Sequence, residues 1–322
     1  MFSSSRRVFL AASAAFLSLT IAGSAVAQDA SKKLRVATSN LYATTSTFPA
    51  AGHDKAGEFT FEIIPFASVT NMIAAINAGE IDVAEMGEVG PVVAQAADVK
   101  GKIIAATEPW RIGEALVVTQ DSPIKTLADL KGKKVSYSRA TNGQWVVNKA
   151  LRDAKLTIDD IESVFLPAGT NIYAVLESGG IDVAVAIDAQ LSAFEAQGAR
   201  RLVNAGDVGV DNSLFFLASD TAIANKKPAL HAFVKQLSTH LSWADANQKE
   251  RAKAVASLLK IDETVAQAVE KSRPKKLQPI QPGLYASNQD VADTLYKQKV
   301  IEKQIKVDSS FTDEFNSSIL SN

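Results

Sequence analysis

The stretch AINAGEIDVA at residues 75–84 recurs one hundred residues later as VLESGGIDVA at residues 175–184. Each copy has the pattern of a helix end, a glycine that can adopt the left-handed conformation that terminates helices, and a short buried strand. Two copies predict two similar α/β lobes that present strand ends and helix starts to a shared cleft. Because helix–glycine–strand junctions are frequent, the chance repeat of a common unit is the alternative.

Short apolar runs alternate with helical patterns on both sides of these repeats. Strands separated by helical stretches indicate βαβ units, and such units build mostly parallel sheets flanked by helices. The expected strands lie at residues 34–37, 60–64, 81–84, 103–106, 115–119, 134–137, 163–166, 181–187, 201–203 and 214–218.

After Asp220 the chain changes to a helical pattern, in which five apolar residues from Leu230 to Leu241 fall on one face. We interpret this tail as a return to the first lobe, so that the chain crosses between the lobes twice, near Gln120 and near Ser219. Such crossings form a hinge that can close around a ligand. The expected division is an export signal at 1–27, a first lobe at 28–119 plus 219–322, and a second lobe at 120–218.

The N-terminus has the layout of a cleavable export signal. A basic start with Arg6 and Arg7 precedes an apolar stretch at residues 8–22, and the small residues 25–27 predict cleavage before Gln28. The arginine pair suggests the twin-arginine route, although signals of the general secretory route also contain such pairs. The apolar stretch is short and diluted by Ser and Thr, which makes it a poor membrane span.

The composition limits the cellular compartments and the binding partners that we expect for this chain. The chain has no cysteine, so it offers no lipid-attachment site, disulfide or thiolate metal site, as expected of a periplasmic protein. Removal of the signal takes away two arginines and no acidic residue, so 34 basic residues fall to 32 against 35 acidic ones, a net charge of −3. This balance argues against nucleic acid as a partner. No later apolar run is long enough for stable membrane insertion.

Residues that carry enzyme chemistry are sparse. His53, His231 and His240 are scattered, and the sequence contains no nucleophile elbow, phosphate loop, dinucleotide fingerprint or metal-spaced cluster. We therefore expect no catalytic residues, no metal and no cofactor.

Three segments carry a family resemblance: MGEVGPVVAQAA at 86–97, the run from DSPIK to LKGKKV at 121–135, and VDN with FFLAS at 210–219. Together they resemble the aliphatic-sulfonate-binding proteins of the nitrate, sulfonate and taurine group of ABC-importer receptors, and the similarity spans nearly the whole chain after the signal. The resemblance implies a two-lobe, type II periplasmic-binding-protein fold. It also implies a monomeric receptor that captures a small organic anion by hinge closure and delivers it to a membrane permease.

Three stretches depart from the pattern of that group, one of them the unusual loop NLYATT at 40–45 after the first strand. IDAQ at 187–190 stands where these receptors often have Trp-Asp-Pro and an aromatic residue, and ATNG at 140–143 replaces a Gly-Ser-Asn turn. We therefore expect an altered pocket for the organic tail, and alkanesulfonate, taurine, sulfate ester, aromatic sulfonate, nitrate and carboxylate all stay open as the anion. An enzyme on the same fold, acting on a pyrimidine or thiamine precursor, is the alternative function.

The stretch SRATNG at residues 138–143 lies between an expected strand and an expected helix. Unpaired backbone N–H groups at such a helix start, together with Thr141 and Asn142, suit a sulfonate or phosphate. Ordinary helix capping by these side chains is the alternative. Asp188 starts the helix after the second repeat strand, where capping likewise competes with ligand contact.

Two further candidates belong to the first lobe. Tyr42, Thr44 and Thr45 lie in a hydroxyl-rich loop after the first strand, where they either donate to a ligand or form an ordinary solvated loop. Glu88 follows the strand of the first repeat, and it could accept from an amine of the ligand or hold a neighbouring loop. Direct contact of its carboxylate with an anion would be repulsive.

Arginine and tryptophan supply the remaining candidates. Arg111 and Arg139 each offer a planar fork that binds oxyanions through paired hydrogen bonds, although a single Arg is more often a surface residue. Trp110 precedes Arg111 in the same loop. Trp145 is expected on the first turn of the second-lobe helix, where it either walls the organic tail or packs between the lobes.

Overall fold

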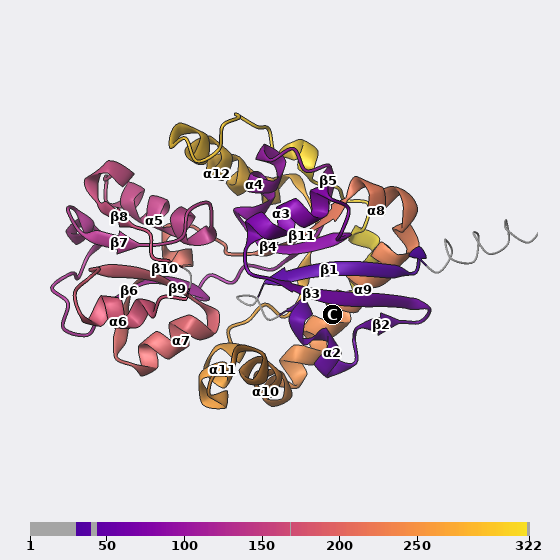
Figure 1. The fold of residues 1–322 in the computed structure, drawn as a ribbon, viewed down its shortest axis with the longest axis horizontal. Helices are drawn as coiled ribbons and strands as arrows, with labels where there is room; N and C mark the ends of the chain where they lie inside the picture. The colour runs from indigo at the N-terminus through magenta and orange to yellow at the C-terminus, as the bar shows by residue number, and fades with distance from the viewer. Residues whose placement is uncertain (1–29, 40–43, 168, 321–322) are drawn as a thin grey trace, which may run out of the picture.

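The computed structural model describes residues 30–39, 44–167 and 169–320, which form two β-sheets flanked by helices (Figure 1). The export signal expected at 1–27 lies outside the described residues. The first lobe contains a sheet with the order β12-β5-β11-β4-β1-β3-β2, made of β1 (Lys33–Ser39), β2 (Lys55–Ala56), β3 (Phe59–Phe66), β4 (Val83–Gly87), β5 (Gly101–Thr107), β11 (Leu214–Ser219) and β12 (Leu277–Gln278). The second lobe contains a sheet with the order β10-β6-β9-β7-β8, made of β6 (Glu114–Thr119), β7 (Lys134–Ser136), β8 (Glu162–Val164), β9 (Val183–Ile187) and β10 (Ala199–Asn204).

Helices connect the strands in both lobes, and further helices form most of the C-terminal third of the chain. The helices of the strand-rich part are α2 (Phe48–Ala51), α3 (Val69–Asn77), α4 (Gly90–Ala96), α5 (Asn142–Asp153), α6 (Ile172–Glu177) and α7 (Asp188–Ala196). Those of the C-terminal part are α8 (Asp220–Asn225), α9 (Lys227–Ala246), α10 (Gln248–Leu259), α11 (Glu263–Glu270) and α12 (Ala286–Lys297).

The repeated sequence occupies equivalent places in the two lobes. Gly79 and Gly179 follow α3 and α6 with φ angles of +71° and +76°. The strands that come next, β4 and β9, pair in parallel with β1 and β7 respectively. The expectation of two similar α/β lobes is therefore confirmed.

The aspartates of the two repeats also make the same contact. The carboxylates of Asp82 and Asp182 each accept a hydrogen bond of 2.8 Å, from the backbone N–H of Arg35 and of Lys134 respectively. The backbone N–H groups of the two aspartates donate to the carbonyl oxygens of the same partners. Each aspartate thus fastens its strand to the start of the neighbouring parallel strand, and a chance repeat would not reproduce this contact.

The left-handed glycines provide a test of the repeat. A Cβ atom at Gly79 or Gly179 would meet no heavy atom within 4 Å, so alanine there is opposed by its backbone conformation alone. We expect Gly79→Ala and Gly179→Ala each to lower the free energy of unfolding by about 1 kcal/mol, measured by urea denaturation. Gly283 is the matched control, because it has equal space without a positive φ. A loss in Gly283→Ala as large as in the other two variants would contradict this account.

The expectation of mostly parallel sheets is confirmed, with exceptions, since β1, β3, β4 and β5 run in one direction in the first sheet, and β7, β8, β9 and β10 do so in the second. β6 runs antiparallel to β9 and β10, and β11 runs antiparallel to β4 and β5. Both strands begin where the chain has just crossed from the other lobe. They therefore enter their sheets at the edge where the neighbouring strands β4 and β9 end.

The strand pairing also moves the crossings between the lobes. β6 belongs to the second lobe and β11 to the first, so the chain crosses at residues 108–113 and 209–213. The division expected near Gln120 and Ser219 places each of these strands in the opposite lobe. An apolar strand has the same pattern in either sheet, so the sequence does not indicate which sheet receives it.

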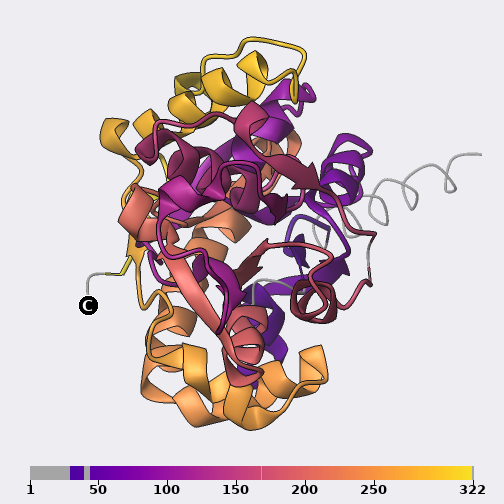
Figure 2. The ribbon, with the colours of Figure 1, turned by 90° about the vertical axis from the view of Figure 1, so that its left-hand side faces the viewer.

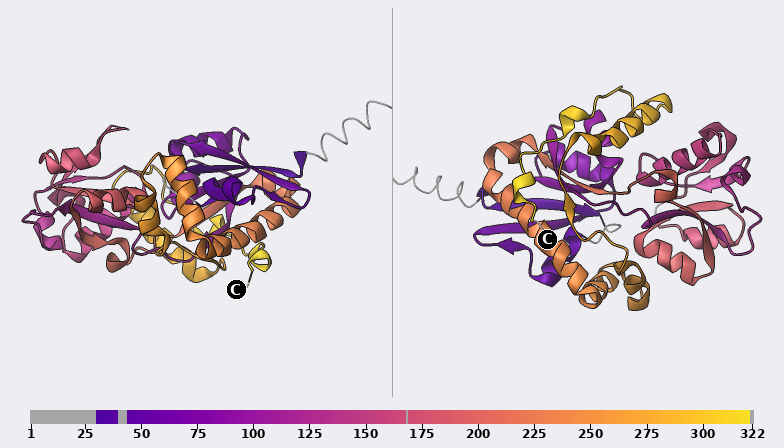
Figure 3. Two further views of the ribbon diagram at one scale, coloured as in Figure 1. Left: turned by 90° about the horizontal axis from the view of Figure 1, so that it is seen from below. Right: turned by 180° about the vertical axis from the view of Figure 1, so that it is seen from behind.

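The C-terminal helices cover the first lobe and reach the second. The predicted apolar face of α9 is confirmed, since its residues from Leu230 to Leu241 pack against Leu34 and Phe216 of the first sheet. α11 packs against α7 of the second lobe, and Gln298 after α12 bonds Gln144 of α5 at 3.0 Å. In Figure 2, α12 and α10–α11 lie at opposite ends of the molecule. The right-hand view of Figure 3 shows both sets extending toward the second lobe.

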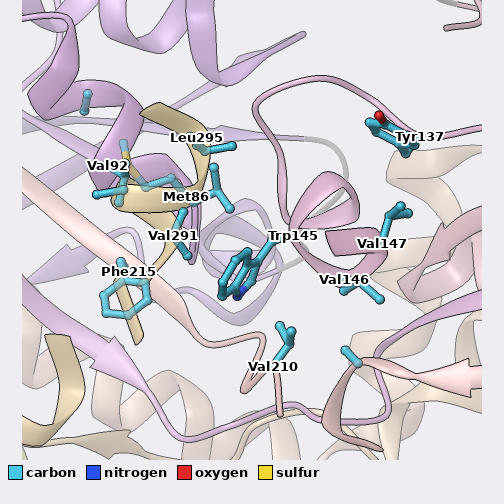
Figure 4. Close-up of a cluster of buried hydrophobic side chains, with 14 of the residues drawn as sticks. Met86, Val92, Tyr137, Trp145, Val146, Val147, Val210, Phe215, Val291 and Leu295 are labelled. Atoms are coloured by element: carbon cyan, nitrogen blue, oxygen red, sulfur yellow. The ribbon is translucent and has the colours of Figure 1, made fainter. Parts of the chain in front are cut away.

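One apolar core is continuous across both lobes. Figure 4 shows Trp145 of α5 beside Met86 of β4 and Val291 of α12. Trp145 is 1% exposed, and it occupies the interlobe core, which is one of its two expected roles. The lobes are thus in contact through an apolar seam as well as through polar groups.

Candidate functional site

Three helices begin soon after inner strands whose ends lie between the lobes. α4, α5 and α7 follow β4, β7 and β9, and no described side chain caps their first turns. The helices after the outer strands β3 and β8 are capped, α3 by Ser68 and α6 by Asn171. Uncapped first-turn N–H groups carry partial positive charge and favour an anion. We call residues 87–90, 110–114, 138–143, 187–189 and 209–213 the interlobe junction.

Backbone strain is concentrated at this junction. Ala140, Asp188 and Asn212 have φ angles of 56°, 56° and 54°. The other described non-glycine residues with positive φ follow α4, α5, α10 and α12, where the left-handed conformation is a common helix terminator. Strain away from helix ends persists where the surroundings enforce it, and it is enriched at functional sites.

Asn142 connects the lobes through both ends of its side chain. Its Oδ1 accepts from the backbone N–H of Val89 in the first lobe at 2.9 Å, and its Nδ2 donates to Oδ1 of Asn212 at 2.8 Å. The backbone N–H of Asn212 donates to Oε2 of Glu88 at 3.0 Å. The three side chains Glu88, Asn142 and Asn212 are at most 3% exposed. This chain of hydrogen bonds can exist only when the lobes are together.

Neither residue expected to cap α5 does so. The hydroxyl of Thr141 donates to the carbonyl oxygen of Ser138 at 2.7 Å, and the side chain of Asn142 is used between the lobes. The first-turn N–H groups of α5 therefore stay without a side-chain acceptor from the described part of the chain.

Two buried carboxyl groups line the junction. Burial raises the pKa of Glu88 to about 7, with Asp211 adding to the rise while bonds from Ser287 and Asn212 oppose it. Burial, together with the nearby charge of Glu88, raises the pKa of Glu114 to about 8. Glu88 Oε1 and Glu114 Oε2 have no hydrogen-bond partner within the described ranges.

Threonines at the end of the first strand and after it donate hydrogen bonds to a third buried acid, Glu85. The backbone N–H and the hydroxyl of Thr45 both donate to Oε2 of Glu85, and Thr38 donates to the same atom at 3.1 Å. Thr44 is 4% exposed in the same cluster. Tyr42 lies outside the described residues. The hydroxyl of Thr45, expected to face a ligand, thus holds the loop to β4 in this structure.

Asp188 belongs to a buried chain of charges that joins the lobes. Both of its carboxylate oxygens accept from Arg273, which also donates from Nε to Glu270 at 2.9 Å. Arg251 donates to Glu270 at 3.2 Å, and Arg273 stacks 5.1 Å from the ring centroid of Trp110. Trp110 is 2% exposed, so Asp188 and Trp110 both act between the lobes rather than at an open surface.

The two candidate arginines lie in different surroundings. Arg111 is exposed and paired with Asp211 at 2.8 Å. Arg139 is exposed and its guanidinium stacks 5.3 Å from the ring centroid of Phe165. The structure thus gives each arginine a protein partner.

Residues 54–263 match a family described as "ABC transporter, phosphonate, periplasmic substrate-binding protein". The chain belongs to this family. It is a periplasmic substrate-binding receptor with a small-molecule ligand and an ABC-transporter permease as partner, so the expected resemblance to ABC-importer receptors is confirmed.

Individual relatives agree with this assignment. The receptor is 29% identical over 251 residues, 76% of each chain, to a putative aliphatic sulfonates-binding protein of Escherichia coli. Its fold is similar to the alkanesulfonate-binding protein SsuA from Xanthomonas axonopodis pv. citri bound to MOPS, with 22% identity, a TM-score of 0.79, and coverage of 87% of this chain and 98% of that one. The desulfurization enzyme DSZB shares the fold at 16% identity and a TM-score of 0.64, over 89% and 98% of the two chains.

Family membership supports a receptor over the enzyme alternative, because the likeness to DSZB extends to the fold alone. Across the described part of the chain, no helix is long and apolar enough to cross a membrane. Over the same ranges, no group of three or more His, Cys, Asp or Glu residues is placed to hold a metal ion.

Sequence reasoning missed two residues of the junction and one residue that binds to it. Glu114 opens β6, Asn212 lies at the second crossing, and Arg273 lies in the segment after α11. Asn212 was part of a stretch that carried the family resemblance, which is a usable signal. Glu114 and Arg273 look like ordinary surface charges in the sequence, because their burial depends on contacts between lobes.

The buried charge chain gives a stability prediction. Arg273→Ala would leave Asp188 and part of Glu270 buried without a cation, so we expect the free energy of unfolding to fall by about 3–5 kcal/mol in urea denaturation.

Arg111→Ala is the control for this variant, because the Arg111 side chain is 63% exposed in its pair with Asp211. An exposed pair is worth less than about 1 kcal/mol. Equal, small losses in the two variants would contradict the structural role of Arg273.

Proposed function

We propose that this receptor binds a small alkanesulfonate at the interlobe junction and closes around it. The observation that carries the proposal is the set of uncapped first turns of α5 and α7, which follow inner strands and point partial positive charge at the junction. The E. coli relative and the sulfonate-bound Xanthomonas structure support the same head group. Asn142 at the start of α5 contributes the amide hydrogen that it does not donate to Asn212, and Thr141, whose hydroxyl donates to Ser138, contributes its backbone N–H.

The buried carboxyl groups favour a sulfonate over a phosphonate. A sulfonate carries one negative charge, whereas a phosphate-like group carries about −1.5 to −2 at neutral pH. Glu88 and Glu114 lie buried in the junction. Glu88, with a pKa of about 7, keeps part of its negative charge at neutral pH, and the repulsion from that charge grows with the charge of the ligand. The family description names phosphonate, so the head group is a point on which this receptor can differ from others of its family.

The other expected contacts form the walls of this proposed site. Thr44 and Thr45 are on the first-lobe side, and Tyr42, outside the described residues, stays a predicted contact. Trp110 and Trp145 are buried between the lobes and support this wall from behind. Glu88, Arg111, Arg139 and Asp188 lie around the head group and set its electrostatic surroundings. A dissociation constant near 1 μM corresponds to about −8 kcal/mol, which several hydrogen bonds to a charged group and one buried tail can supply.

A ligand screen tests the sulfonate assignment. Ethanesulfonate at about a hundredfold excess over its dissociation constant should stabilise the receptor by about 2.7 kcal/mol, a shift that is easily seen in thermal unfolding. Ethylphosphonate and nitrate should give smaller shifts. A larger shift with ethylphosphonate than with ethanesulfonate would overturn the choice of head group.

The same assay tests the role of Asn142. Asn142→Ala removes a donor from the sulfonate and the hydrogen bonds that join the closed lobes, so we expect at least about tenfold weaker binding, or about 1.4 kcal/mol. Asn171→Ala is the matched control, since Asn171 caps α6 outside the junction. Unchanged ethanesulfonate affinity in Asn142→Ala would place the ligand elsewhere.

We further propose that the receptor is exported by the twin-arginine route, is cleaved before Gln28 and acts as a monomer. The paired Arg6 and Arg7 and the small residues at 25–27 support this proposal. Mass spectrometry of protein recovered from the periplasm should show Gln28 as the first residue. A chain that retains Arg6 and Arg7 there would exclude cleavage.

A further inference from the structure

Two buried carboxyl groups from different lobes lie close enough to influence each other. Glu88 follows β4 of the first lobe, and Glu114 is the first residue of β6 in the second lobe. Glu88 is 1% exposed and Glu114 is 2% exposed. Glu88 Oε1 and Glu114 Oε2 each lack a hydrogen-bond partner among the residues described. The junction therefore buries two acids that form no ion pair with a cation from the described ranges.

The charged groups around the pair do not supply the missing cation. Asp211 and Lys149 act on Glu88 in opposite directions. Lys149 lies 4.0 Å from Asp290, with its ammonium 5.6 Å from the ring centroid of Trp145, and Asp211 is paired with Arg111. The charge that acts on Glu114 is Glu88 itself.

The start of α5 also faces Glu114. A Cβ atom at Gly143 would lie 3.5 Å from Glu114 Oε1, so the carboxyl group is next to the first turn of that helix. The helix dipole favours a negative charge there by less than about 2 kcal/mol. This contribution is smaller than the cost of burying a second carboxylate beside the first.

We propose that closing of the two lobes takes up a proton, which the Glu88–Glu114 pair holds between the lobes. Opening carries Glu114 away with the second lobe and admits water to both carboxyl groups, so they ionise independently. Closing buries both groups, and two adjacent carboxylates without a cation cannot both stay ionised at low cost. This inference concerns the protein alone, and it holds whatever anion the receptor binds.

The protonation of the two carboxyl groups determines how lobe closing depends on pH. Burial holds the pKa values of Glu88 and Glu114 near 7 and 8 in the closed arrangement, above the value of about 4.3 for a solvated glutamate. The closed state therefore binds more protons than the open state between these values. Closing is therefore favoured at low pH. As the pH rises to about 8, the ratio of closed to open molecules falls by up to about tenfold per pH unit for each proton that closing takes up.

The chain offers a direct measurement of closure. It has no cysteine, so Lys55→Cys and Glu162→Cys introduce unique label sites on exposed residues of the first and the second lobe. Electron-spin distance measurements on the doubly labelled, ligand-free protein report the ratio of closed to open molecules. From about pH 6 to about pH 8 we expect this ratio to fall by at least about tenfold, and to level off above about pH 8.

Substitutions of Glu88 and Glu114 test whether this pair causes the pH dependence of closing. In the labelled background, Glu114→Gln should weaken the pH dependence and make it level off near pH 7 instead of pH 8, because Glu88, whose pKa burial holds at about 7, is then the one acid of the pair that remains. Glu88→Gln serves the same purpose if Glu114→Gln fails to fold. Glu195→Gln is the control, since Glu195 is paired with Arg201 at 2.7 Å away from the pair, and it should retain the wild-type profile.

Two results would overturn the proposal. One is a distance distribution in the wild-type protein that stays the same across this pH range, whether open or closed. The other is a folded Glu114→Gln or Glu88→Gln variant that keeps the wild-type pH dependence. Neither result depends on ethanesulfonate, so the proton uptake and the sulfonate assignment fail separately.

Discussion

The ends of β4, β7 and β9 meet where the two lobes touch, and this constraint determines the chemistry of the interlobe junction. A helix start exposes N–H groups that the strand before it cannot satisfy. The receptor satisfies part of this demand across the lobes, since Asn142 accepts from Val89 and Asn212 donates to Glu88. In the proposed site, a ligand meets the first turn of α5 and those first-turn N–H groups of α7 that follow Asp188, whose own N–H donates to Gly113. Buried N–H groups without a partner are costly, so an anion bound there stabilises the closed arrangement.

The apolar seam and the buried charges contribute differently to the contact between the lobes. A tryptophan that buries about 200 Å² at about 25 cal/mol per Å² contributes up to about 5 kcal/mol, and Trp145 is such a residue. The pair of Arg273 and Asp188 loses most of its attraction to desolvation. Its planar, two-pronged contact fixes how α7 meets the segment after α11. The seam therefore supplies most of the energy of closure, and the charges specify its geometry.

The repeated AINAGEIDVA pattern was sufficient to predict the two α/β lobes, because glycine ends and apolar strands are local properties of the chain. The placement of β6 and β11 was not predictable in this way, since strand exchange between sheets is decided by pairing partners far apart in the sequence. The residues of the site also differ in how well the sequence predicts them. Asn142 was found from its place at a helix start, whereas Glu114 and Arg273 are charged residues whose burial arises only when the lobes meet.

The junction links the proton to the anion. A sulfonate at the first turn of α5 lies on the same side of that helix as Glu114, whose Oε1 adjoins Gly143. Protonation of Glu114 removes the repulsion that an ionised carboxylate would exert on the ligand. The proton and the anion then favour the same closed state. By linkage, the factor by which the anion raises the affinity for the proton equals the factor by which the proton raises the affinity for the anion. If both proposals hold, the affinity of the receptor for its anion falls as the pH rises.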